Sequence, residues 1–414
     1  MTASTRVGGG RADLLRQRAA ELLPEIAAGA AERERLRELP HAQIRALAAN
    51  GLFTFRIPVE YGGAGASVQE VFAFLIDLAA ADSNIAQAVR PSFGRVEHLL
   101  AAAEAERRTW YPRFLAGDVF GNAGWEVGGP SGAVRTRITR QGDHFEVNGS
   151  KYYSTGALYA DWIGLSAVDD DGEKVFFTLP RDRPGLELVD DFDGVGQRLT
   201  ASGTTKLTAV TVYPEEISRR GGQGRSAVTP FLQLYLAAVE AGIARSALGD
   251  AVAFARAKSR PIEHSSADRS VDDPYVQHAV GEIAARTYAA EAAVLRAASA
   301  IDRAWATAAS DSDGRDLNGR DLNGPDQGGL DQDALTEAAV EVAQAQFFAV
   351  ESALKAAELL FDVGGGTAVA QRHNLDRHWR NARTVANHNP RSWKAAVVGA
   401  HRLNGTEPPL NGLF

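Results

Sequence analysis

The chain of 414 residues contains no cysteine and only one methionine. Without cysteine it can form no disulfide, no thiolate metal site and no cysteine nucleophile. No apolar run reaches the length that spans a bilayer, and the first residues lack an apolar stretch of signal-peptide type. The formal net charge of −8 opposes a nucleic-acid role, which needs a basic surface to neutralise phosphates. A cytoplasmic protein without a membrane or nucleic-acid partner is therefore expected.

The usual catalytic signatures are also absent. The sequence has no HExxH, GxSxG or GxxxxGK[ST] motif. The three glycines at 364–366 follow a predicted helix rather than a strand, so they do not form a dinucleotide-binding Rossmann turn. Consecutive glycines still allow a phosphate-bearing group to approach the backbone closely. His373, Asp376 and His378 form no closed ligand set, so no metal is expected.

What is present changes character twice along the chain. From about Arg11 to Leu115, apolar residues recur at helical spacing. From Val134 to about Val212, short alternating runs are separated by turn signals, which predicts an antiparallel sheet or small barrel. From about Val228, long alanine-rich helical stretches predict a bundle. The fold class is α+β, mainly α, with expected domains at 1–117, 118–226 and 227–414.

Local signals predict where several elements begin and end. Ser67 can cap a helix, and Pro40 and Gly51 bound a short one. Asn389 is expected to cap the last helix ahead of Pro390. Residues 310–332 hold the tandem repeat GRDLNGRDLNG and too few apolar residues to fold, which predicts a flexible inserted loop. The first bundle helix is expected to end at Pro261. The second is expected to span Tyr275–Ala308 and the third Leu335–Phe361.

Three segments resemble the acyl-CoA dehydrogenase superfamily. GNAGWEVGGPSGAVRT and NGSKYYSTGALYADW resemble its two flavin-contacting segments, and FDVGGGTAVAQRHNLDRHWRNART resembles the glycine motif that meets flavin across a subunit interface. The resemblance implies an N-terminal helical domain, a middle antiparallel β-barrel domain and a C-terminal four-helix bundle. It also implies a homotetramer or homodimer.

The base that such dehydrogenases need is missing from both of its usual places. The stretch ARTVANHNPRSWK contains no carboxylate, the turn around Leu232 is apolar, and Glu240 lies well past that turn. KYYSTGALYADW, SRP, and LDRHWRNART followed by a histidine and a proline resemble the flavin monooxygenase branch instead. That branch includes dibenzothiophene monooxygenase, amine N-hydroxylases and indole hydroxylases. The likeness implies reduced FAD or FMN from a separate NAD(P)H-flavin reductase, and O2 activated as a C4a-hydroperoxide.

The predicted activity is hydroxylation of an electron-rich, indole-type aromatic, of the kind found in natural-product tailoring. Three alternatives stay open. The first is N- or S-oxygenation by the same chemistry, and the second is an acyl-CoA dehydrogenase with a relocated base. The third is a non-catalytic flavin-fold scaffold.

The resemblance also nominates site residues. His388 would contact the activated oxygen. Alternatively, it could be a structural residue that packs in the core or caps a helix. Ser92 and Val385 stand where desulfurisation enzymes have histidines, which argues against dibenzothiophene sulfoxidation. Tyr153 could instead be a core aromatic. Lys258 and Arg260 are candidates for the flavin phosphate, but they could simply supply favourable charge at a helix C-terminus. The nominated catalytic residues are His388, Ser154, Asn122 and Ser92, and the nominated cofactor-binding residues are Trp125, Tyr153, Thr155, Lys258, Arg260, Gly364, Gly365, Gly366 and Arg377.

Overall fold

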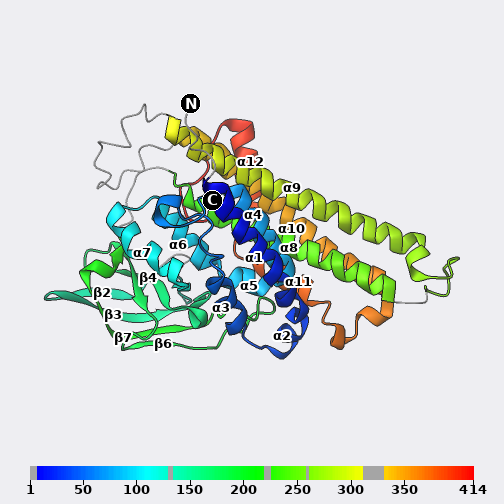
Figure 1. The fold of residues 1–414 in the computed structure, drawn as a ribbon, viewed down its shortest axis with the longest axis horizontal. Helices are drawn as coiled ribbons and strands as arrows, with labels where there is room; N and C mark the ends of the chain where they lie inside the picture. Colours follow the sequence, from blue (N-terminus) through cyan, green and yellow to red (C-terminus); the bar gives the residue numbers. More distant parts are fainter. Residues whose placement is uncertain (1–6, 129–133, 219–224, 258–260, 311–330) are drawn as a thin grey trace.

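The computed structural model describes residues 7–128, 134–218, 225–257, 261–310 and 331–414. Helices come first, a sheet follows, and long helices end the chain (Figure 1). The predicted order of elements is therefore confirmed.

Local sequence signals mark where two of the N-terminal helices begin and end. Ser67 accepts a hydrogen bond from the Glu70 backbone N–H while the Glu70 side chain bonds back to the Ser67 backbone, a capping box. The short helix expected between Pro40 and Gly51 is confirmed as α3. The helices are α1 (Val7–Ala28), α2 (Ala30–Leu36), α3 (His41–Ala49), α4 (Val68–Ala81), α5 (Ser83–Ala88), α6 (Arg90–Leu100) and α7 (Glu104–Ala116).

The sheet is mixed rather than wholly antiparallel. Its strands lie in the order β6-β7-β3-β2-β4-β5-β8, and β1 pairs with β4. The pairs β1–β4 and β2–β4 are parallel, whereas the other pairs are antiparallel. The long excursion through the β2–β3 hairpin gives the crossover that a parallel pair requires. The strands are β1 (Phe120–Ala123), β2 (Arg137–Gln141), β3 (His144–Lys151), β4 (Trp162–Val168), β5 (Lys174–Pro180), β6 (Leu186–Leu188), β7 (Thr205–Val212) and β8 (Ile217–Ser218).

Three long helices, α8 (Val228–Ala257), α9 (Pro274–Ser310) and α10 (Gln332–Ala368), pack along one another at the end of the molecule away from the sheet (Figure 1). The shorter helices α11 (Arg377–Ala386) and α12 (Arg391–Asn404) pack on α10. The predicted flexible loop falls mostly on residues 311–330, which lie outside the described residues.

The predicted cap of the last helix is wrong. Pro390, not Asn389, is the N-cap residue of α12, and no side chain caps this helix. The Asn389 side chain is buried and donates a hydrogen bond to the Gln233 side chain on α8. This tertiary contact withdraws the amide from the capping position.

Apolar packing joins the first and last parts of the chain. One core cluster runs through the N-terminal helices and the long C-terminal helices, and a second one lies beneath the sheet. Phe72 of α4 meets Phe231 of α8 edge to face, with ring centroids 5.0 Å apart. Gly242 of α8 lies so close to α4 that an added Cβ would come within 2.4 Å of the Ala79 Cβ. A side chain at position 242 would force these two helices apart.

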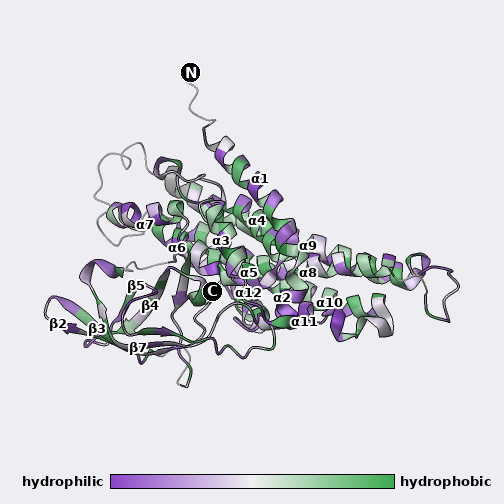
Figure 2. Ribbon diagram, turned by 60° about the horizontal axis from the view of Figure 1, so that its bottom comes forward, coloured by the Kyte–Doolittle hydropathy of each residue, from purple (hydrophilic) through white to green (hydrophobic). Residues whose placement is uncertain are grey.

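One described helix, α8, is long and apolar enough to cross a membrane by length and composition, which the sequence did not lead us to expect. However, 78% of its most apolar window is buried inside the protein, as in the core helix of a globular domain. Apolar and hydrophilic residues alternate along the long helices in Figure 2. A single helix of this kind is weak evidence for a membrane role, since a buried core helix passes the same test.

Candidate active site

A cavity of about 310 Å³ opens where α6, the first turns of α8 and the sheet meet. Its walls combine aromatic, small and basic side chains, and none of the described residues that line it is Asp or Glu. The lining residues are Arg90, Pro91, Gly94, Arg95, His98, Phe120, Gly121, Asn122, Gly124, Trp125, Thr155, Gly164, Leu165, Ser166, Lys174, Phe176, Phe177, Thr178, Ser218, Leu232 and Gly412.

The two segments expected to contact flavin lie side by side at this cavity. The Asn122 backbone N–H donates to the Thr155 carbonyl at 3.1 Å, and the Tyr152 N–H donates to the Trp125 carbonyl at 2.9 Å. These backbone bonds fix residues 122–125 against residues 152–155. The sequence placed the two segments 30 residues apart without showing that they pair.

A buried ion pair clamps the same two segments. Lys151 is buried, and its Nζ atom donates to Glu126 Oε1 at 2.6 Å. Burial opposes ionisation of Glu126, but hydrogen bonds from Lys151 and from the Thr136 and Arg135 backbone outweigh it and lower its pKa to about 2. The carboxylate is thus charged at neutral pH. It holds Trp125 beside the end of β3.

Three nominated residues line the cavity: Asn122, Trp125 and Thr155. The Asn122 Oδ1 atom is buried and has no hydrogen-bond partner among the described residues, so it can accept a bond from a ligand. Trp125 is 46% exposed and Tyr153 is 49% exposed, and Tyr153 has a positive φ of 60°. Tyr153 is therefore no core aromatic, and its ring is free to meet a ligand or a second subunit.

The two nominated serines do not line the cavity. Ser92 Oγ donates to the Phe120 carbonyl and accepts from the Phe120 N–H, at 3.1 and 3.0 Å, which ties α6 to β1. Ser154 is buried, and its Oγ accepts from Thr205 Oγ1 at 2.8 Å. Both hydroxyls are engaged in holding the walls of the site. Their catalytic roles stay predictions.

His388 follows the end of α11 and is not among the lining residues of the cavity, but it lies near Arg90, which does line it. Its Nε2 atom is 3.3 Å from the side-chain nitrogen of Gln87 on α5. Burial of the ring, followed by the charge of Arg90, lowers the pKa of His388 to about 4. With this pKa the ring is neutral at pH 7. In this orientation of the Gln87 amide, its nitrogen donates and Nε2 of His388 accepts. His388 caps neither helix, because Asn387 and Pro390 hold those positions.

The nominated glycines 364–366 are not among the lining residues of this cavity. Gly365 sits within α10 at φ 54° and ψ −152°, a backbone conformation that essentially only glycine adopts, and it bends the end of the helix. Gly364 lies against Phe254 of α8, whereas Gly366 faces open space. Lys258 and Arg260 lie outside the described residues.

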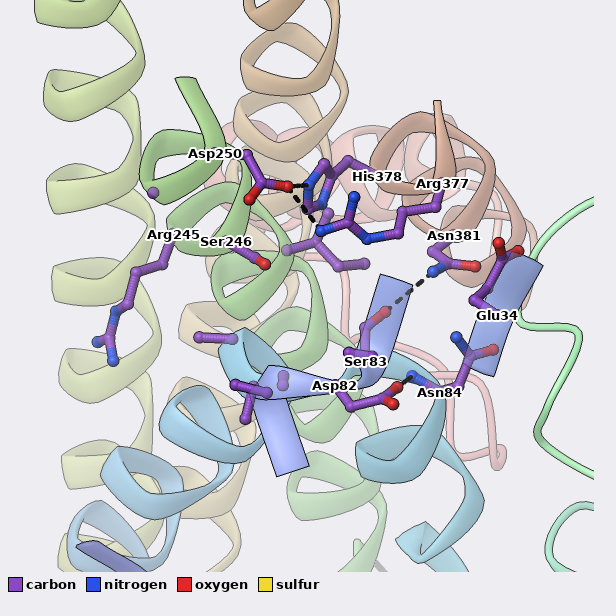
Figure 3. A pocket seen from close by; sticks show the side chains of 17 residues that line it. Glu34, Asp82, Ser83, Asn84, Arg245, Ser246, Asp250, Arg377, His378 and Asn381 are labelled. Carbon is purple, nitrogen blue, oxygen red and sulfur yellow. Dashed lines mark hydrogen bonds and ion pairs between the residues drawn. The ribbon is translucent and has the colours of Figure 1, made fainter. Parts of the chain in front are cut away.

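Arg377 belongs to a polar cluster between α8 and α11. Asp250 accepts hydrogen bonds from Arg377 at 2.6 Å and from His378 at 2.7 Å (Figure 3). The cluster borders a second cavity, of about 350 Å³, which shares no lining residue with the first. Within the described part of the chain, no group of three or more His, Asp or Glu residues is placed to hold a metal.

Sequence reasoning missed most of the wall residues, among them Arg90 and Gly412. Nothing in the sequence places the side chain of Arg90 in a cavity. Gly412 comes from the last residues of the chain, and its carbonyl accepts a hydrogen bond from the Gln233 side chain at 2.9 Å. The C-terminal tail thus folds back onto the site.

Family models agree with this arrangement. The acyl-CoA dehydrogenase N-terminal domain matches residues 11–118, and the acyl-CoA dehydrogenase C-terminal domain matches residues 234–321 and 326–393. Fold and site together define a flavoenzyme of the acyl-CoA dehydrogenase type.

Individual relatives narrow the assignment. The chain is 30% identical to the probable FMNH2-dependent monooxygenase SfnC of Pseudomonas putida, over 94% of this chain and 95% of that one. It is 29% identical to dibenzothiophene monooxygenase of Rhodococcus erythropolis, over 92% and 91%. The chain belongs to the flavin-dependent monooxygenase branch of the acyl-CoA dehydrogenase family.

Solved structures agree. FMN-bound TdsC of Paenibacillus sp. A11-2 superposes with a TM-score of 0.84 at 27% identity, covering 97% of this chain and all of that one. Methanesulfinate monooxygenase MsuC of Pseudomonas fluorescens gives 0.82 at 29% identity, covering 96% and 99%.

Proposed function

We propose that this enzyme uses reduced FMN or FAD from a separate NAD(P)H-flavin reductase to place one oxygen atom on an electron-rich, indole-type aromatic. The observation that carries the proposal is the cavity without a carboxylate, beside the paired segments 122–125 and 152–155. Dehydrogenation of a thioester needs a base at that place. Glu240 is fully buried and is not among the lining residues, so it does not supply one.

The residues at the cavity fit a flavin ring. Trp125 and Tyr153 present exposed aromatic surface, and the Asn122 Oδ1 atom awaits a donor such as a ring N–H. We assign Asn122, Trp125, Tyr153 and Thr155 to the ring. We assign the glycines 364–366, with Arg377, Lys258 and Arg260, to the remainder of a flavin shared between subunits.

Bound reduced flavin supplies two electrons and activates dioxygen, so that one oxygen atom enters the substrate and the other leaves as water. The chain's own residues exclude water and orient the reactants. Neutral His388 holds a proton on Nδ1, since its Nε2 accepts from Gln87, and it can donate that N–H toward the oxygen being transferred. The apolar residues of the wall, including Phe177 and Leu232, keep water from competing.

Oxygenation at sulfur is the second candidate. Relatives at 28–30% identity include several dibenzothiophene monooxygenases, and MsuC is named for methanesulfinate. The aromatic preference has its own support, because TdsC is also solved with FMN and indole at 28% identity and a TM-score of 0.83. Both candidates use the same oxygen chemistry.

The test supplies purified protein with a flavin reductase, NADH, FMN or FAD, and ¹⁸O₂, and offers indole. Mass spectrometry should find one ¹⁸O atom in the product. A reaction without the protein, with catalase added, is the control. Hydrogen peroxide as the sole product with indole and with other electron-rich aromatics would refute aromatic hydroxylation. Reduction of a dye by an acyl-CoA would revive the dehydrogenase alternative.

A further inference from the structure

Arg90 has no carboxylate partner among the described residues, unlike most arginines of the protein interior. Arg33, Arg56 and Arg95 pair with Asp82, Glu97 and Glu106 at 3.0, 2.8 and 2.9 Å. Among the described residues, the Arg90 side chain makes one hydrogen bond, from its NH2 group to the Leu232 carbonyl at 3.1 Å, and its Nε atom is buried without a partner. A guanidinium has five N–H donors, so most of its bonding capacity is unused.

This unpaired cation lines the 310 Å³ cavity. Burial lowers the pKa of Arg90 to about 10, which leaves it charged at neutral pH. A buried charge is costly unless it is paired. Arg90 is also the first residue of α6, where the helix dipole adds positive potential. The described residues therefore supply no negative charge to balance Arg90, and a bound ligand could supply it.

We infer that Arg90 binds an anionic group of the substrate, so that the enzyme's preferred substrates are aromatic compounds carrying a carboxylate or an acid of similar shape, such as a sulfinate. The planar guanidinium matches such a group through two parallel hydrogen bonds. Unsubstituted indole offers no counter-charge. This inference rests on the proposed function, because it concerns the same cavity.

The position of Arg90 favours the substrate over the flavin phosphate as the source of the anion. Its charge acts on His388, the residue assigned to the oxygen-transfer end of the site. The glycines 364–366, assigned to the rest of the flavin, lie on α10 and do not line this cavity. The anion is thus expected beside the reacting atoms.

Binding, measured by calorimetry without turnover, tests the inference. The wild-type protein saturated with oxidised FMN should bind indole-3-acetate at least about tenfold more tightly than indole, the strength expected of one buried charged bond. Arg90→Met should abolish that preference and leave indole binding unchanged, whereas Arg90→Lys should restore part of it. Equal affinity for the two compounds in the wild type, or an equal loss for both in Arg90→Met, would overturn the inference.

Two further arms keep the interpretation unambiguous. If Arg90→Met weakens binding of FMN but not of riboflavin, the anion is the flavin phosphate and the substrate assignment is wrong. Competition on the wild-type protein needs no variant: benzoate should displace indole-3-acetate and benzamide should not, and equal displacement by both would contradict the inference. A retained preference for the acid, with no ¹⁸O in either indole compound, would refute the proposed function but not the role of Arg90.

Discussion

At the scale of single residues, the interior of α8 holds a carboxyl group that has no partner. Glu240 is fully buried, and neither side-chain oxygen has a hydrogen-bond partner among the described residues. Burial raises its pKa well above 4.5, although Arg383 and Arg391 oppose this. A group of this kind favours the folded state at low pH. That contribution is lost as the pH rises from 4.5 through the raised pKa.

Glu240→Gln should therefore stabilise the protein at alkaline pH. The free energy of unfolding in urea should rise by about 2 kcal/mol at pH 8, and the gain should vanish near pH 4. Because Glu240 does not line the cavity, oxygenation should persist. The same change at exposed Glu25 is the control. A stability gain that is independent of pH would contradict this account, and loss of oxygenation would contradict the exclusion of Glu240 from the site.

The role of His388 is tested by its removal. His388→Ala should lower the yield of oxygenated product per dioxygen consumed by about 10²-fold, because the positioned N–H donor is lost. Reduced flavin should still be oxidised, with hydrogen peroxide as the product. Exposed His264, replaced by alanine, provides the matched control. Coupled turnover at the wild-type level would remove His388 from the mechanism.

At the scale of elements, the end of α10 depends on one glycine. The backbone of Gly365 lies at φ 54° and ψ −152°, where a Cβ is strained whatever space surrounds it. The neighbouring Gly366 has no atom within 4 Å of an added Cβ. The two positions therefore form an internal pair that separates backbone strain from side-chain crowding.

Gly365→Ala should lower the free energy of unfolding by about 1–3 kcal/mol and weaken flavin binding, because the bend that presents the glycine motif is lost. Gly366→Ala should be neutral or stabilising by up to about 1 kcal/mol. Urea denaturation and fluorescence titration with FMN measure the two effects. Equal behaviour of the two variants would show that the bend is irrelevant.

At the scale of the whole molecule, large apolar side chains remain in contact with solvent on the C-terminal helices. Tyr275 and Tyr288 on α9 are 83% and 77% exposed, and Trp393 and Leu403 on α12 are 70% and 83% exposed. Exposed aromatics of this size are typical of protein interfaces. Together with the expected flavin site between subunits, they support the proposed homodimer or homotetramer.

Light scattering should then give a mass of two or four times the chain mass of 44.1 kDa. Trp393→Glu or Tyr288→Glu should lower that mass and reduce flavin affinity in parallel, because a charge is placed in an apolar interface. As the control, Arg140→Glu at an exposed position on β2 should leave the mass unchanged. A monomer that binds flavin tightly would contradict the shared site.

The sequence by itself determined the order of helices, sheet and bundle, the cap at Ser67, and the missing base. Each of these depends on local spacing or on residue identity, which the chain carries wherever it folds. The same holds for Asn122, Trp125 and Thr155, whose segments could be recognised by their motifs.

Tertiary structure alone decided the parallel pairing of β1 with β4, the withdrawal of Asn389 from its capping position, the burial of Glu240, and the place of Arg90 in the cavity wall. Each depends on contacts between residues that are far apart in the chain, such as Asn389 with Gln233 and Arg90 with Leu232. Local propensity cannot encode such contacts, because the environment of a side chain is fixed only when distant elements pack against it.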